Sequence, residues 1–292
     1  MSFQIDTAFV KQYHDNIERL LQQRGSKFRG KSRQESQNSE EQFWEQVDLI
    51  EATEVSDRHG DSPLMETPHS RRRVTLRQFE VGELIDKFDK VKMLIDPTST
   101  YIQNFVDALN RKYDDVFIAA ATGTAYTGKS GGTATAFDSA YQVSASFGGA
   151  ASNLTINKLI EAQRLLTAAQ NDPDLQTWYL ALTSSQKASL LKTTQVQSAD
   201  YNTVRALVRG EINTFMGFEF VHSERLLKSG NNRSVLAWVK DGMLVSTGMD
   251  IQTEVARRPD KRFSMYAYAA MAVGAVRMQE PKVVEILCDE TA

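Results

Sequence analysis

The sequence predicts an α+β fold with two lobes, from which an arm and a loop project. Three features support this prediction: a long amphipathic helix near residue 100, alternating helices and strands from 155 to 222, and strands near the end of the chain. Hydrophobic residues make up 41% of the 292 and charged residues 24%, which is typical of a globular protein with a sizeable core. The length allows one large domain or two ordinary ones.

Composition also limits the class of protein. The net charge of −3 excludes the strongly basic footprint of a free DNA-binding protein, although a local basic surface remains possible. The single cysteine, Cys288, cannot form an internal disulfide or a multi-cysteine zinc site, and burial in a strand is expected for it. The N-terminus does not have the pattern of a signal peptide, and no apolar run can span a bilayer. We therefore expect a soluble protein made in the cytoplasm.

Residues 1–42 are expected to form an arm. Apolar residues recur at helical spacing from Phe9, whereas the segment from Arg24 onward is polar and has almost nothing to bury. That segment is expected to be disordered in an isolated subunit. Its basic residues can contact DNA phosphates or carboxylates of a neighbouring subunit, and both alternatives stay open. They are Arg24, Lys27, Arg29, Lys31 and Arg33.

Residues 43–90 are expected to form a long β-hairpin excursion. Two strand-forming segments flank a polar tip that contains a glycine and two prolines, and compact domains rarely keep such a tip unless it binds something. We expect the tip and its flank to contact another subunit. The candidate residues are His59, Asp61, Met65, Arg71, Arg72 and Arg73. The histidine and acidic residues of the tip allow a metal site, but a solvated loop is favoured.

Residues 91–150 begin with the clearest helix, predicted over 96–121 with Asp96 and Pro97 at its start and Asp114 and Asp115 on its wet side. A flexible loop rich in Gly, Ser, Thr and Ala is expected after it, over 123–152.

Residues 151–250 are expected to fold into a second unit. The predicted elements are helices over 155–170, 184–192 and 199–209, strands over 178–183 and 215–222, and a hairpin over 235–248 that turns at Asp241-Gly242. Residues 251–292 are expected to form a long strand from Phe263, a break at Glu280-Pro281 and a final strand over 283–289.

One segment matches an enzymatic motif. Residues 123–130, GTAYTGKS, fit the phosphate-binding pattern G-x-x-x-x-G-K-[ST], in which Lys129 and Ser130 would hold the terminal phosphate and magnesium. A working loop follows a buried strand and opens a helix. Here the preceding DDVFIAAAT continues a helix and the following GGTATAF cannot start one. A flexible loop at a helix end is therefore favoured, and a nucleotide-binding enzyme remains the alternative.

The order of these parts resembles the major capsid proteins of tailed bacteriophages, of the Hong Kong phage type. The resemblance covers nearly the whole chain and is carried by four strings: GDSPLMETPHSRRRV, DKFDKVKMLIDPTSTY, SADYNTVRALVRGEINTFMGFEF and VHSERLL. It implies an N-arm over 1–42, an E-loop and the start of the peripheral domain over 43–90, and a spine helix and peripheral domain over 91–150. It further implies an axial domain over 151–250 and C-terminal strands of both domains over 251–292. In this family the E-loop lies over the neighbouring subunit.

The resemblance implies a shell protein with no catalytic, cofactor or metal residues. It would assemble in the host cytoplasm as hexamers and pentamers into an icosahedral virion capsid around double-stranded DNA. The implied partners are further copies of itself, a portal protein, a separate scaffolding protein and an optional cement protein, with no membrane. Some members crosslink an E-loop lysine to another subunit, but no lysine occurs from Ser32 to Asp86. An encapsulin-like shell protein is a further alternative.

Overall fold

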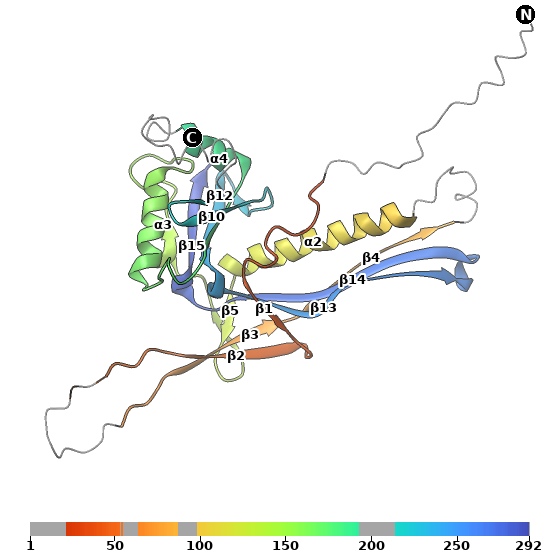
Figure 1. The fold of residues 1–292 in the computed structure, drawn as a ribbon, viewed down its shortest axis with the longest axis horizontal. Helices are drawn as coiled ribbons and strands as arrows, with labels where there is room; N and C mark the ends of the chain where they lie inside the picture. The colour runs from red at the N-terminus through yellow and green to blue at the C-terminus, as the bar shows by residue number, and fades with distance from the viewer. Residues whose placement is uncertain (1–21, 53, 55–63, 87–97, 193–213, 292) are drawn as a thin grey trace, which may run out of the picture.

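A computed structural model describes residues 22–52, 54, 64–86, 98–192 and 214–291 of the chain. Within these ranges the protein is elongated (Figure 1). A lobe lies at one end, a long helix and a long sheet run from it in parallel layers, and a narrow hairpin projects on the other side. The fold is built from three sheets.

The first sheet is the long layer, with strand order β1-β13-β14-β4. Its strands are β1 (Arg33–Ser36), β13 (Met243–Arg258), β14 (Ser264–Arg277) and β4 (Arg77–Ile85). The helix α2 (Thr98–Thr122) packs along it, mainly on β14. Ala267 and Ala269 of β14 belong to the hydrophobic core, and their small side chains allow the helix and the sheet to approach closely. At 1.5 Å per residue, the helix spans about 37 Å.

The second sheet forms the lobe, with strand order β7-β15-β12-β8-β10-β9 and β11 paired with β12. Its strands are β7 (Gln142–Val143), β15 (Val283–Asp289), β12 (Asn232–Val239), β8 (Trp178–Leu182), β10 (Phe218–His222), β9 (Thr214–Phe215) and β11 (Lys228–Ser229). Every residue of β8 is buried, as expected for a central strand. The helices α3 (Ile156–Ala168) and α4 (Ser184–Lys192) belong to this lobe, and Thr155 caps α3.

The third sheet carries the projecting hairpin, with strand order β2-β3-β5-β6. Its strands are β2 (Glu41–Val47), β3 (His69–Thr75), β5 (Ala125–Thr127) and β6 (Thr133–Thr135). The strands β2 and β3 pair antiparallel along their whole length, from Glu41 with Thr75 to Val47 with His69. The hairpin therefore starts from a short sheet of its own beside the long layer.

An aromatic cluster joins the arm, α2 and the lobe. Phe28 stacks on Phe117 of α2 with ring centroids 4.8 Å apart, and it lies 5.7 Å from Trp238 of β12. Trp238 also stacks on Tyr179 of β8. The indole nitrogen of Trp238 donates to the carbonyl of Lys31 at 2.8 Å. One continuous core thus holds the long layer, the lobe and the arm together.

Several predicted elements are confirmed: the long helix, the helices near 155–170 and 184–192, the strand from Trp178, and the strands at the end of the chain. Cys288 is buried in β15 as expected, and burial raises the pKa of its thiol to about 12. The N-terminal helix, the helix over 199–209, the cap at Asp96 and Pro97, and the tip residues His59 and Asp61 lie outside the described residues.

The hairpin predicted at Asp241-Gly242 is wrong. Strands β12 and β13 are joined there by a short 3-10 turn, Lys240–Gly242, and they pair in different sheets. The glycine serves close packing instead, because a Cβ on Gly242 would lie 2.6 Å from Cβ of Lys282. The single strand expected over 215–222 is also wrong, since Met216 and Gly217 adopt positive φ angles and turn β9 back against β10.

The arm and its contact with α2 correct two further predictions. The segment from Arg24 buries Phe28 completely, and β1 pairs in parallel with β13, so this part of the arm is ordered on its own subunit. Asp114 is fully buried against the arm and is not on the wet side of the helix. Asp115 does face outward, where it pairs with Arg225 at 2.6 Å. The expected loop over 123–152 contains the strands β5, β6 and β7.

Glu290 anchors the end of the chain to the lobe, and this gives a pH prediction. Its carboxylate accepts hydrogen bonds from Arg233 Nε at 2.9 Å and from Lys228 Nζ, which lower its pKa from 4.5 to about 2. A depressed carboxyl pKa stabilises the folded state above the unfolded pKa, and this stabilisation is lost as pH falls toward the folded pKa. We expect Glu290→Gln to lower the free energy of unfolding by about 1.5–3 kcal/mol at pH 7.

The difference in the free energy of unfolding between wild type and Glu290→Gln should then shrink as the pH falls from about 4.5 to about 2. Urea titrations of the unassembled subunit across this pH range measure the difference in the free energy of unfolding. A difference that does not change with pH would contradict the assignment.

Candidate assembly interface

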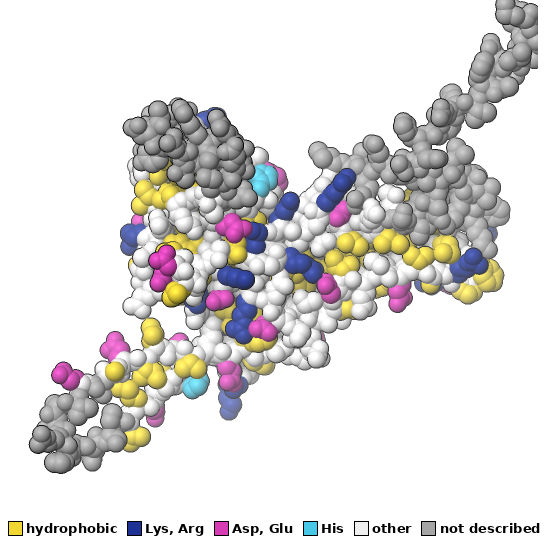
Figure 2. Space-filling view, in the orientation of Figure 1, with side chains coloured by type: hydrophobic (Ala, Val, Ile, Leu, Met, Phe, Trp, Pro, Cys, Tyr) yellow, Lys and Arg dark blue, Asp and Glu magenta, His cyan; other side chains and the backbone are white. Residues whose placement is uncertain are grey.

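The projecting hairpin carries apolar side chains that its own subunit does not cover. Among the described residues, its outermost cross-strand backbone hydrogen bond joins the amide of Asp48 to the carbonyl of Pro68 at 3.0 Å. Beyond this bond, Leu49 is 86% exposed and Leu64 fully exposed, and Ile50 and Met65 are also exposed. Figures 1 and 2 show this part extending away from the body, with hydrophobic side chains along it. Exposed apolar side chains of this kind mark an interaction surface.

The three predicted arginines lie at the base of the hairpin, and each is paired within the chain. Arg71 contacts Glu45 at 2.6 Å and Arg73 contacts Glu41 at 3.1 Å, both across the β2–β3 pair. Arg72 points the other way, toward the body. These residues therefore brace the hairpin, and Met65 is the predicted contact residue that the structure places on its exposed part.

A buried polar network fixes the hairpin base to the end of the long helix. Arg277 is fully buried, and its guanidinium binds the carboxylate of Glu280 through Nε at 2.6 Å and Nη2 at 3.0 Å. It also donates to the carbonyl of Ala121, in the last turn of α2, at 2.8 Å and to that of Gly123, the residue after the helix, at 2.9 Å. Arg72 shares Glu280 at 3.4 Å and donates to the carbonyl of Met278 at 2.9 Å. The network sets the direction of the hairpin relative to the helix.

The basic residues of the arm are mostly neutralised within the subunit. Arg29 pairs with Asp250, Lys31 with Glu219, and Arg33 with Glu35. The two others, Arg24 and Lys27, are exposed and form no ion pair with the residues that the structure describes.

Carboxylates on one face of α2 hold the arm. Asp114 accepts hydrogen bonds from the amide of Lys27 at 3.0 Å, from Gln23 Nε2 at 2.6 Å and from the hydroxyl of Ser26. Two helical turns earlier, the carboxylate of Asp107 accepts a hydrogen bond from the amide of Gly25 at 3.1 Å. Because a buried carboxylate needs such donors, the arm and the helix stabilise each other.

The GTAYTGKS segment does not have the geometry of a phosphate-binding loop. Ala125–Thr127 is a strand at the edge of the hairpin sheet, residues 128–131 form a tight turn, and a second strand follows at Thr133–Thr135. Lys129 is exposed at this turn. A phosphate-binding loop must lead into a helix whose N-terminus faces the phosphates, and here a strand takes that place.

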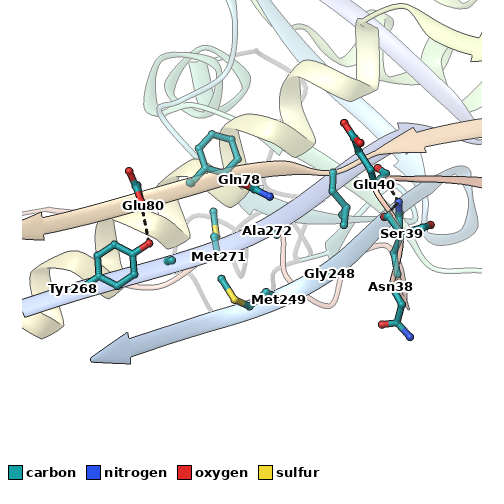
Figure 3. A pocket seen from close by; sticks show the side chains of 14 residues that line it. Asn38, Ser39, Glu40, Gln78, Glu80, Gly248, Met249, Tyr268, Met271 and Ala272 are labelled. Atoms are coloured by element: carbon teal, nitrogen blue, oxygen red, sulfur yellow. Dashed lines mark hydrogen bonds between the residues drawn. The ribbon is translucent and has the colours of Figure 1, made fainter. Parts of the chain in front are cut away.

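A hollow of about 1110 Å³ lies on the face of the long sheet. Figure 3 shows Tyr268 and Glu80 at one end, joined by a hydrogen bond of 2.9 Å, Ser39 and Glu40 at the other, and methionine side chains between them. Its lining contains no histidine, cysteine or lysine. The described residues also contain no cluster of three potential metal ligands. Its lining combines methionine and alanine side chains with polar ones, a composition that protein interfaces also have.

The chain matches the family model for phage capsid protein over residues 5–290. It belongs to the phage capsid protein family. The resemblance found in the sequence is therefore confirmed, and the chain is a structural subunit, a major capsid shell protein of the virion. The described helices include none with the length and apolar content needed to cross a bilayer.

Solved phage capsids share the fold of this capsid protein at low sequence identity. The capsid of cyanophage P-SCSP1u aligns with a TM-score of 0.76 and 15% identity, over 97% of this chain and 94% of that chain. The capsid of Ralstonia phage GP4 gives 0.76 and 10%, over 96% and 95%. The capsid of Helicobacter pylori bacteriophage KHP30 gives 0.72 and 9%, over 99% and 98%. No curated protein sequence matches the chain.

Sequence reasoning missed three functional groups of residues. Leu49 and Ile50, which are exposed, lie in a segment that the sequence predicts only as strand. Apolar residues that stand among acidic ones beside a polar tip could have indicated an interaction surface. Glu280 was read as part of a chain break, and its role depends on contact with Arg72, which is distant in sequence. Phe28 is a single aromatic residue in a polar segment. Its burial could not be predicted, because periodicity requires several apolar residues at regular spacing.

Proposed function

We propose that this capsid protein self-assembles as hexamers and pentamers into an icosahedral head that encloses double-stranded DNA. The observation that carries the proposal is the projecting hairpin, whose Leu49 and Leu64 are exposed on an isolated subunit. Burying such side chains against a neighbour contributes about 25 cal/mol per Å² of apolar area. Many contacts of this kind, repeated by symmetry, stabilise a closed shell.

The parts of the fold support a division of roles within the shell. We assign the N-arm to 1–42, the E-loop and the start of the peripheral domain to 43–90, the spine helix and peripheral domain to 91–150, and the axial domain to 151–250. The lobe sheet favours the axial role for most of that range, and the last strand, β15, joins the same sheet. The strands of 251–292 are thus shared between the peripheral and axial domains.

The partners we propose are a portal protein, a separate scaffolding protein, a possible cement protein and packaged DNA, with assembly in the host cytoplasm. Arg24 and Lys27 support contact with DNA phosphates, because both are exposed and form no ion pair with a described residue. The absence of lysine from 32 to 86 supports a shell held by non-covalent contacts at this loop.

The test is expression of the chain, alone and with its phage's scaffolding protein, followed by negative-stain electron microscopy. Closed shells, tubes, or free hexamers and pentamers are expected. A uniformly monomeric protein at every salt concentration, with and without scaffold, would overturn the proposal. Leu64→Asp should prevent particle formation without changing the melting temperature of the subunit, because Leu64 makes no packing contact within it.

A further inference from the structure

A lysine is enclosed in the lobe without a carboxylate partner. Lys158, in the first turn of α3, is fully buried. Its side-chain nitrogen donates to three backbone carbonyls, those of Ser152 at 2.6 Å, Ala145 at 2.9 Å and Leu287 at 3.0 Å. The ion pairs that the structure describes in the lobe all involve other side chains. Lysine is rarely buried unless it is paired, so three carbonyls take the place of a counter-ion here.

The three contacts require a charged amine. Three acceptors need three N–H donors, and a lysine side chain offers three only when it is protonated. A neutral amine would leave one buried carbonyl without a donor, which costs free energy. Burial lowers the pKa of Lys158, whereas Cys288 and Asp289 raise it. The carbonyls thus form a cation site that the chain fills with its own ammonium group.

The carbonyls of this site come from the two ends of one loop and from the last strand. Ala145 and Ser152 bound the loop 145–152, and the amide of Ser152 also donates to the carbonyl of Ala145 at 3.0 Å. The carbonyl of Ser152 accepts a further hydrogen bond from the amide of Asp289 at 3.0 Å. The ammonium of Lys158 therefore closes the neck of the loop and connects it to the end of β15.

This loop belongs to a strap, residues 142–152, that covers an edge of the lobe sheet. The strap begins with β7, which pairs with only two residues of β15, Glu285 and Ile286. Because the strand order is β7-β15-β12, β15 would be the edge strand of the sheet without the strap. An uncovered edge strand presents free N–H and C=O groups that can pair with another chain. A ladder of two residue pairs is short, so the contacts of Lys158 are a major part of what holds the strap in place.

We propose that the ammonium of Lys158 acts as a built-in structural cation that keeps the strap over the edge of β15. Without this cation the strap should open locally and expose β15 to pairing with other copies of the chain outside their native contacts. The inference does not depend on the proposed shell, since all of these contacts lie within one subunit.

The test compares variants of the full-length, unassembled subunit by hydrogen exchange and by light scattering on warming. Lys158→Met nearly keeps the volume of the side chain and removes its donors. Lys192→Met is the matched control, because Lys192 is an exposed lysine at the end of α4. Exchange is followed over 144–153 and 287–290, and exchange in β8 serves as the reference for global unfolding.

We expect exchange in both segments of Lys158→Met to be about tenfold faster or more, with unchanged exchange in β8 and stronger light scattering. The control should behave like the wild type. Unchanged exchange in the strap would overturn the inference. An equal acceleration in β8 would also overturn it, because the lysine would then support the whole lobe rather than the strap.

Chemical rescue separates the charge of the lysine from its packing. Lys158→Ala removes three methylene groups and the ammonium, which propylammonium can replace. Propylammonium chloride should return the exchange of this variant toward the wild-type rate. Tetramethylammonium chloride and 1-propanol at the same concentration should not, since the first has no N–H donor and the second has no charge. Equal rescue by 1-propanol, or rescue by none of the three, would overturn the inference, and Lys158→Met alone decides it if Lys158→Ala does not fold.

Discussion

Glu280→Ala is expected to lower the free energy of unfolding by about 3–5 kcal/mol, because it leaves a buried guanidinium without its carboxylate. Arg277 is fully buried, and Glu280 supplies both of its side-chain acceptors. The same change removes the carboxylate partner of Arg72, so the base of the hairpin should also loosen. Charges removed from water are tolerated only when they are paired.

Urea denaturation of the unassembled subunit measures the loss in stability. The matched control is Glu161→Ala, which removes the carboxylate of another Arg–Glu pair at the same spacing, with hydrogen bonds of 2.7 and 2.8 Å, on the exposed side of α3. The control should leave the denaturation midpoint unchanged, because solvent replaces the lost contacts of an exposed pair. Equal effects of the two changes would show that burial of Arg277 has no energetic consequence.

Phe28→Ala is expected to cost about 3–5 kcal/mol, since it empties a fully enclosed site between α2 and the lobe. The ring stacks on Phe117 and contacts Trp238, so its removal leaves a cavity that neighbouring elements cannot readily close. The effect should extend beyond stability. Without this anchor, the hydrogen bonds from the arm to Asp114 should open more often.

Hydrogen exchange of the amides over 22–37 measures that opening, and urea denaturation measures the stability. Phe147→Ala is a suitable control, because Phe147 is 36% exposed in a loop of the lobe. We expect faster exchange in the arm of Phe28→Ala and no change in the control. An arm that stays protected after loss of Phe28 would mean that the carboxylates of α2 hold it alone.

Local patterns were enough to predict much of the fold. The helix near residue 100 repeats its apolar residues over 25 positions, a length at which periodicity is unambiguous. Two further elements have local signals: Thr155 is a capping residue at the start of α3, and the strand from Trp178 is a short apolar run. These elements depend on neighbours in sequence, and the structure confirms them.

The errors occur where distant segments decide the outcome. Asp241-Gly242 favours a tight hairpin locally, but β12 and β13 each find better partners in separate sheets. Asp114 looks like a solvent-facing carboxylate until the arm, almost ninety residues earlier, supplies its donors. For the assembly surface, the sequence identified the hairpin and its polar tip, but the exposure of its apolar residues depends on the absence of tertiary contacts, which sequence alone does not reveal.

The parallel pairing of β1 with β13 imposes an order in time on the newly made protein. Arg33 is paired with Leu244, which the ribosome adds about two hundred residues later. At about 5–20 residues per second, the arm waits roughly 10–40 s for the strand that receives it. During that interval it is open to chaperones or to other chains. The long layer that receives the arm is therefore completed only late in synthesis, after all strands of the projecting hairpin's sheet have been made.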